Sequence, residues 1–114
     1  MPKKKVKILG EAWTLDICPK EKYESLKNGR AGFCDSTVRL MAVDDFTTLE
    51  PSPHVLRDLH VSLRSIIRHE MLHAFLAESG LMGESQWAED EEMIDWFANQ
   101  LPKIVEAMKQ VGAL

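Results

Sequence analysis

The chain has 114 residues, of which 45% are hydrophobic and 28% are charged, and its net charge is −4. A chain of this length buries enough surface for one hydrophobic core but not for two, so we expect a single domain over residues 1–114. No segment approaches the roughly 18 consecutive apolar residues of a membrane span, and no apolar segment with a cleavage site follows the basic start. We therefore expect a soluble, cytoplasmic protein with no membrane partner.

Charge and cysteine content narrow the classes of ligand. Residues 1–57 carry a net charge of +2, and residues 58–114 carry a net charge of −6. An acidic half makes nucleic acid an unfavourable ligand and suits a cation. The two cysteines, Cys18 and Cys34, lack the spacing of a metal site or of a disulfide framework, so we expect reduced thiols.

Four lysines, at positions 3, 4, 5 and 7, lie near the start of the chain. Such a run resembles a nucleic-acid or nuclear-import patch. A short basic run at a terminus is more often solvated than bound to a ligand. We expect a frayed, solvated terminus, and nucleic-acid binding through Lys3, Lys4, Lys5 and Lys7 is the weakest of the functions considered.

The first half of the chain is typical of strands and turns. Apolar residues alternate loosely over residues 5–17 around Gly10 and Glu11, which predicts a strand, a turn and a second strand. Residues 20–27 predict one short helical turn or a loop, and residues 28–32 predict a turn. Residues 33–43 alternate again and predict a third, half-buried strand. Residues 1–50 are thus expected to be mainly β-strands and loops.

Helical periodicity dominates the second half. The segment 52–80 predicts one long helix of about 40 Å. Its first residue would be Pro53 and its last Ser79, with Gly80 just past its end. Residues 87–111 predict a second helix, in which Pro102 should introduce a kink or a break. Strands followed by helices indicate an α+β domain, in which a small antiparallel or mixed sheet packs against both helices.

The long helix contains the pattern H-E-x-x-H at His69, Glu70 and His73. Histidines four residues apart point to the same helical face, so both imidazoles can bind one metal ion. Glu70 lies beside them, where its carboxylate can accept a proton from a water molecule on the metal. The alternative is a pair of histidines that only form hydrogen bonds near the helix surface.

A catalytic zinc ion takes three protein ligands and leaves a fourth position open. The extended pattern with glycine and histidine at positions 76 and 79 is excluded, because these residues are Leu76 and Ser79. His54 and His60 lie too far along or around the helix to share the site. A carboxylate is therefore the expected third ligand, with Cys34 as a less favoured alternative.

The second helix begins with a run of acidic residues. Glu91 and Asp95 are four residues apart on the face that also carries Ile94 and Ala98, so this face turns partly toward the core. We expect Glu91 to bind the metal and Asp95 to accept the second N–H of a ligating histidine. Glu92 is the second choice of ligand. Alternatively, the acidic first turn only interacts favourably with the helix macrodipole.

Two segments carry a resemblance to a known family. H-E-x-x-H followed by a helix with E-x-x-x-D resembles the gluzincin arrangement of thermolysin-like zinc peptidases, through HEMLHAFLAESG at residues 69–80 and EEMIDWFA at residues 91–98. The chain length is similar to that of minimal, phage- or prophage-type members. The resemblance implies a zincin-like fold and a zinc-dependent peptidase that hydrolyses a protein or peptide substrate.

The resemblance also implies roles for individual residues. His69, His73 and Glu91 would be the ligands of a Zn2+ ion, Glu70 the general base and Asp95 the residue that orients a histidine. Larger gluzincins carry a further histidine or tyrosine that stabilises the oxyanion. Tyr23, Arg39 or a protein partner that completes the site would have to replace it here.

Zincins often pair an extended substrate with the last strand before the active-site helix. The corresponding segment contains Thr37, Val38, Arg39, Leu40 and Met41, and a plain sheet edge is the alternative interpretation.

A second function, from a different class, is a zinc-binding but catalytically silent accessory or structural protein of a phage-like particle or regulatory complex. The short chain and the missing oxyanion residue favour it. Trp87, Trp96 and Phe97 would then form a partner surface, although aromatic residues at helical spacing more often belong to a core.

Overall fold

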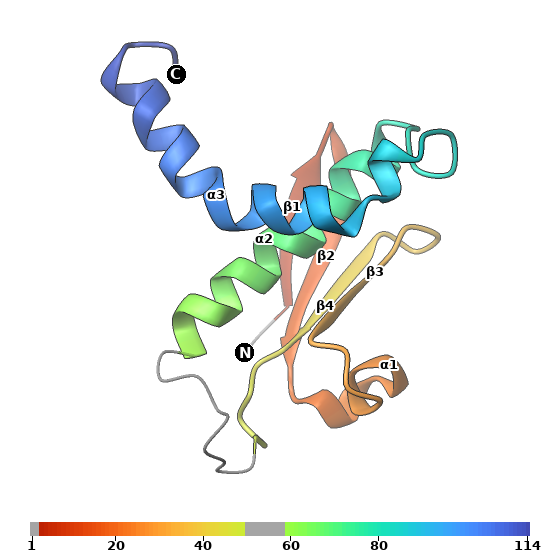
Figure 1. Ribbon diagram of the computed structural model, residues 1–114. Helices are drawn as coiled ribbons and strands as arrows, with labels where there is room; N and C mark the ends of the chain where they lie inside the picture. The colour runs from red at the N-terminus through yellow and green to blue at the C-terminus, as the bar shows by residue number, and fades with distance from the viewer. Residues whose placement is uncertain (1–2, 50–58) are drawn as a thin grey trace.

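The computed structural model describes residues 3–49 and 59–114, and the backbone alone at His60 (Figure 1). In chain order its elements are β1 (Lys3–Ile8), β2 (Glu11–Cys18), the 3-10 helix η1 (Lys20–Lys22), α1 (Glu24–Lys27), β3 (Gly32–Asp35), β4 (Leu40–Asp44), α2 (Leu59–Glu78), the 3-10 helix η2 (Trp87–Glu89) and α3 (Glu91–Gln110). Strands precede the two long helices, so the α+β class predicted from the sequence is confirmed.

The strands form one mixed sheet with the order β1-β2-β4-β3. The outer pairs are antiparallel, and the central strands β2 and β4 are parallel. Leu9 and Gly10 join β1 to β2 with φ angles of 50° and 89°. Two successive positive φ angles are what a two-residue hairpin of type I′ requires. The predicted strand–turn–strand is therefore confirmed, with the turn one residue earlier than expected.

The lysine run belongs to a strand and is not a frayed terminus. Lys3 to Lys7 lie in β1 and pair with residues 12–16 of β2. Lys5 Nζ donates a hydrogen bond of 2.6 Å to Thr14 Oγ1. Because β1 is an edge strand, its exposed lysines oppose pairing with the edge of another sheet.

Residues 33–43 do not form the single strand that their alternation predicted. They form β3, a turn over residues 36–39, and β4. Asp35 Oδ1 accepts hydrogen bonds from the backbone N–H and the hydroxyl of Thr37, and Arg39 has a φ angle of 50°. This local bonding reverses the chain, while the alternation of apolar residues continues through the turn.

The substrate-edge prediction for residues 37–41 was consequently wrong. Thr37, Val38 and Arg39 lie in the turn, while Leu40 and Met41 belong to β4, which has β2 on one side and β3 on the other. Since the chain folds back on itself here, β4, the last strand before the long helix in the described residues, is central in the sheet. The edge strand on this side is β3.

Helix α2 packs on one face of the sheet. Alternate residues of β2 and β4 supply the buried core on this face, and α2 contributes one fully buried and several half-buried residues. This core contains Ile8, Trp13, Leu15, Ile17, Met41, Val43 and Ala74, with Leu63, Ile66, Ile67, Met71 and Ala77 packed against it. The opposite face is covered by Leu26 of α1, which packs with Cys18 and Ala42.

Helix α2 ends as predicted. Its last residue is Glu78, and Gly80 follows with a φ angle of 85°. The N–H of Leu81 bonds back to the carbonyl of Leu76 at 3.2 Å, which satisfies a terminal carbonyl. The predicted start of this helix at residue 52 lies outside the described residues.

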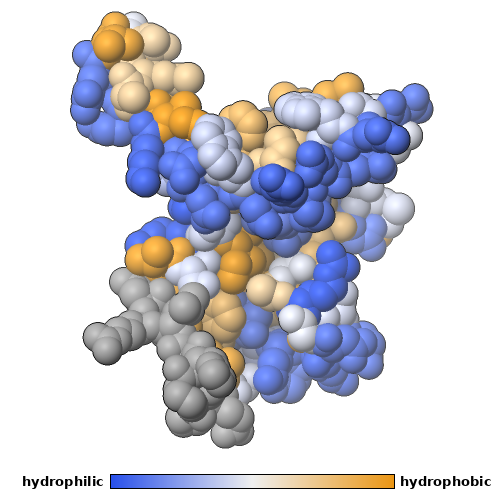
Figure 2. Space-filling view, in the orientation of Figure 1, coloured by the Kyte–Doolittle hydropathy of each residue, from blue (hydrophilic) through white to orange (hydrophobic). Residues whose placement is uncertain are grey.

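Helix α3 packs on α2 and crosses it in the view of Figure 1. It begins at Glu91 and not at residue 87, because residues 87–89 form η2 and Asp90 caps the helix. Pro102 lies inside α3 and does not split it, but the helix bends part-way along its length (Figure 1). Its C-terminal half projects from the molecule and carries apolar residues on the face shown in Figure 2.

Within the described ranges, no helix is long and apolar enough to cross a bilayer.

Candidate metal centre

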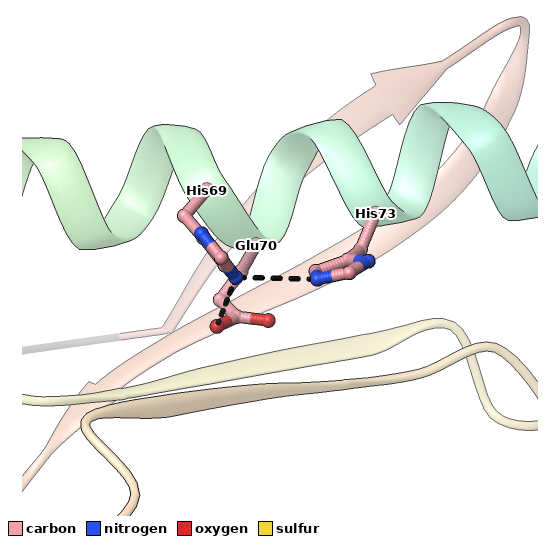
Figure 3. Close-up of side chains that lie close together, drawn as sticks. All are labelled: His69, Glu70 and His73. Atoms are coloured by element: carbon pink, nitrogen blue, oxygen red, sulfur yellow. Dashed lines mark hydrogen bonds and ion pairs between the residues drawn. The ribbon is translucent and has the colours of Figure 1, made fainter. Parts of the chain in front are cut away.

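The side chains of His69, Glu70 and His73 all project from α2 toward the strands β3 and β4 (Figure 3). The Nε2 atoms of the two histidines lie 3.2 Å apart. Two ligand atoms on a tetrahedral zinc ion, each about 2.05 Å from the metal, are separated by about 3.3 Å. The two imidazoles therefore already have the separation of ligands that share one ion.

Glu91 brings a third candidate ligand from the first turn of α3. Its Oε2 lies 3.1 Å from Nε2 of His69, and its Oε1 lies 3.1 Å from Nε2 of His73. The Nε2 atoms of the two histidines and the two carboxylate oxygens of Glu91 thus form a cluster of four donor atoms, in which each oxygen faces one imidazole. The Glu91 side chain is 61% exposed, so the centre opens to solvent on the side of α3.

Asp95 contacts the ring nitrogen of His69 that does not face Glu91. Its Oδ1 lies 2.7 Å from Nδ1 of His69, one helical turn after Glu91. An Nδ1–H that donates to this carboxylate leaves the Nε2 lone pair facing His73 and Glu91. A carboxylate in this position orients a ligating imidazole and increases its basicity.

Glu70 is buried beneath the histidines. Its residue is 5% exposed, and its Oε2 lies 4.0 Å from Nε2 of His69. Burial raises the pKa of Glu70 to about 7, although the nearby positive charges of His69 and Arg30 act in the opposite direction. This carboxyl group therefore exchanges a proton near neutral pH.

Burial also affects His73. It lowers the pKa of the imidazole, and the opposing charge of Glu91 only partly offsets it. The neutral imidazole that results is the form that binds a metal ion.

Two hollows flank these side chains, with volumes of about 300 Å³ and 240 Å³. Glu70 and Arg30 line both of them, so the two hollows meet at the candidate metal centre. The first hollow is also lined by Ala31, Gly32, Ser65, Ile66, His69, Asp95 and Ala98, and the second by Cys34, Ser36, His73, Ala77, Met82 and Glu91. Together they form a path along β3, between the edge of the sheet and the helices.

The structure separates the alternatives for the third ligand. Glu91 contacts both imidazoles, whereas Glu92 is exposed and its backbone N–H donates to Asp90. Cys34 lines the second hollow, and burial, together with Glu70 and Asp35, raises the pKa of its thiol to about 12. In the absence of a metal ion, a thiol with this pKa stays protonated.

The two residues considered as oxyanion donors are engaged elsewhere. The Tyr23 hydroxyl donates to Asp16 Oδ2 at 2.7 Å, on the face of the sheet opposite α2. Arg39 Nε donates to Glu78 Oε1 at 2.7 Å, beside the β3–β4 turn. Neither side chain lines either hollow.

Sequence reasoning missed two residues of this site, Arg30 and Gly32. Arg30 lines both hollows, and Gly32 lies directly against Glu70. Both belong to a segment that in the sequence indicated only a turn. No spacing relates them to the histidine motif, because the sheet and not the helix places them there.

Comparison of this chain with protein-family models, with curated proteins and with solved structures finds no match. The chemistry of the site is therefore inferred from its own geometry.

Proposed function

We propose that this protein is a zinc-dependent peptidase with His69, His73 and Glu91 as the metal ligands. The observation that carries the proposal is a cluster of four donor atoms, in which the two histidine Nε2 atoms lie 3.2 Å apart and each carboxylate oxygen of Glu91 lies 3.1 Å from one of them. When bound, zinc lowers the pKa of a water molecule toward about 7 and polarises the substrate carbonyl. The likeness of the sequence motifs to gluzincins, and with it a zincin-like arrangement, supports the same conclusion.

Glu70 moves the proton in this mechanism. Its carboxylate accepts a proton from the attacking water, whose oxygen forms a bond to the carbonyl carbon. The carbon–nitrogen bond then breaks, and Glu70 delivers the proton to the leaving amine. Glu70 would ionise more readily beside a bound cation, and the ionised form is the one that accepts the first proton. Asp95 keeps His69 in the tautomer that the centre requires.

An extended peptide fits the path along β3. This strand pairs with β4 on one side and forms the edge of the described sheet on the other. A peptide backbone can add to such an edge through main-chain hydrogen bonds, while pockets accept alternate side chains. The two hollows lie on either side of Glu70 and would accept side chains that flank the cleaved bond.

The test compares zinc content with cleavage of a denatured protein mixture, with and without a chelator. We expect Glu70→Gln to keep one zinc ion per chain and to lose turnover by about 10²–10⁴-fold, because only the proton acceptor is removed. His73→Ala should lose both zinc and turnover, and chelation should abolish cleavage by the unmodified protein.

Glu92→Gln is the matched control, since it removes an exposed carboxylate next to Glu91 and should change neither property. Full cleavage by Glu70→Gln or His73→Ala would contradict the mechanism. Loss of zinc in Glu92→Gln would contradict the assignment of Glu91 as the ligand.

A second candidate function is a catalytically silent zinc-binding protein that recognises a partner. The indoles of Trp87 and Trp96 favour it, because they are 54% and 56% exposed near the start of α3. Trp96 also contacts the ring of Phe97 edge-on, at 5.3 Å between centroids. One zinc ion per chain without chelator-sensitive cleavage would support this function over the peptidase.

A further inference from the structure

Arg30 is a cation placed where the two hollows of the candidate metal centre meet. It lies just before β3, and its backbone N–H bonds to the carbonyl of Ser25 at 3.4 Å. No other lysine or arginine of the described residues lines either hollow. Its charge acts on both sides of the centre, because it lowers the pKa of Glu70 and of His73.

The guanidinium of Arg30 also has no ionic partner within the described residues. The other arginine near the sheet, Arg39, pairs with Glu78 at 2.7 Å. The carboxylates near the centre are used differently: Glu91 contacts both imidazoles, and Asp95 contacts His69. The five N–H donors of Arg30 therefore remain available to an acceptor that enters the path along β3.

We propose that Arg30 is a further catalytic residue, which binds the carbonyl oxygen of the cleaved peptide bond and stabilises the negative charge that develops on it. This inference rests on the peptidase function proposed above. Arg30 could instead bind an acidic side chain of the substrate. A cation in that role would lie at the outer end of one hollow, whereas Arg30 borders both hollows, as Glu70 does. Its position therefore favours contact with the reacting carbonyl group.

Charge that develops during the reaction is stabilised best by a donor that is already in place. The backbone of Arg30 is held in the turn before β3 by the hydrogen bond from its N–H to the carbonyl of Ser25, so the base of the side chain is already in place beside the hollows, and the guanidinium becomes ordered when it binds the carbonyl oxygen. Tyr23 and Arg39 line neither hollow, so they are not placed to stabilise the oxyanion. Arg30, in the turn before β3, takes this role in our proposal.

The experiment measures kcat and KM for a neutral peptide substrate and the Kd of a phosphonate tripeptide, in which a tetrahedral anion replaces the reacting carbonyl. The zinc-loaded protein is compared with Arg30→Gln, Arg30→Lys and Arg64→Gln. Arg64 is an exposed arginine of α2 that lines neither hollow, so it controls for the loss of one positive charge.

We expect Arg30→Gln to lower kcat by about 10²–10³-fold, which is typical for removal of one oxyanion donor. KM should change less than about threefold, since the ground-state carbonyl carries little charge. The phosphonate should bind at least about 30-fold more weakly, zinc content should stay at one ion per chain, and Arg30→Lys should restore part of both losses. Arg64→Gln should match the unmodified protein.

Three results would overturn the inference. They are an unchanged Kd for the phosphonate in Arg30→Gln, an effect confined to KM, and a shift of the pH profile of kcat without a loss at its maximum. The last result would mean that Arg30 acts only through the ionisation of Glu70.

The phosphonate also separates this inference from the peptidase proposal. If the protein binds zinc and phosphonate in an Arg30-dependent manner but cleaves no peptide, the peptidase proposal fails and the anion site stands. If cleavage occurs and is insensitive to Arg30→Gln, the peptidase proposal stands and the role of Arg30 fails.

Discussion

Gly32 shows how one missing side chain shapes the site. A Cβ atom at this position would lie 3.0 Å from Oε2 of Glu70, 3.1 Å from its Cγ and 3.1 Å from the backbone oxygen of Ala42. Because the backbone oxygen cannot move out of the way easily, any larger residue pushes on Glu70. Glycine at this position therefore allows the carboxylate to lie directly against β3.

We predict that Gly32→Ala lowers turnover by about tenfold to a hundredfold, because displacement of a reacting group by a fraction of an ångström to about 1 Å has effects of this size. Zinc content should not change, since no ligand is moved. Turnover and metal analysis on the same preparation check this.

Gly112→Ala is a suitable control for that prediction. Gly112 has a φ angle of 73° and open space around it, and it follows the projecting C-terminal end of α3 (Figure 1), so alanine there strains the backbone away from the site. It should cost stability and leave turnover unchanged. Normal turnover in Gly32→Ala would show that the contact with Glu70 has no role in catalysis.

At the scale of elements, the site depends on how α3 begins. Asp90 is the N-cap, and its side chain accepts hydrogen bonds from the N–H groups of Glu92 and Met93. The next residue, Glu91, is the first of the helix and contacts both histidines. The cap therefore sets the position of the one proposed ligand that does not come from α2.

We predict that Asp90→Ala lowers the free energy of unfolding by about 1 kcal/mol, the usual effect of removing an N-cap. It should also weaken zinc binding, because the turn that carries Glu91 loses two hydrogen bonds. Denaturant unfolding and a metal-competition titration measure the two effects.

Asp90→Asn is the matched variant for this prediction, since asparagine caps a helix about as well as aspartate. It should preserve both stability and zinc affinity. If Asp90→Ala binds zinc as tightly as the unmodified protein, the cap does not position the ligand.

For the whole molecule, the response to acid reports on a buried carboxylate far from the site. The side chain of Asp16 is 2% exposed and accepts contacts of 2.7 Å from both Lys22 and Tyr23. Burial acts to raise its pKa, but the hydrogen bonds from Lys22 and Tyr23 outweigh burial and hold the pKa below the usual 3.8. These contacts connect the η1–α1 segment to β2.

A carboxyl whose pKa is lower in the folded state stabilises the fold above its usual pKa and loses this effect as the pH falls through the folded value. We therefore predict that the unmodified protein is more stable than Asp16→Asn at pH 7 and that the difference shrinks below about pH 4. Urea unfolding at several pH values checks this.

The comparison for the acid response is Glu24→Gln, at a surface carboxylate whose side chain is 79% exposed and 3.3 Å from Lys27. An exposed pair of this kind contributes little, so this variant should follow the unmodified protein at every pH. A stability difference for Asp16→Asn that is the same at pH 7 and pH 3 would contradict the role of its ionised form.

The sequence by itself determined the features that depend on residues close together in the chain. The spacing of His69 and His73 places both imidazoles on one face of any helix that contains them, and the end of α2 follows from Gly80. Helical spacing also favoured Glu91 over Glu92, because Glu91 lies on the face that turns toward the core. In the structure, α3 brings Glu91 to the histidines. Strands followed by helices were likewise enough to predict an α+β fold.

Only the tertiary structure decided which distant segments meet. Alternation over residues 33–43 is compatible with one strand or with a hairpin, and side-chain bonding within the turn selects the hairpin. That reversal makes β3 the edge strand and carries Arg30 and Gly32 to the histidines of α2. Periodicity describes the faces of an element, but which faces pack together depends on contacts between residues far apart in the sequence.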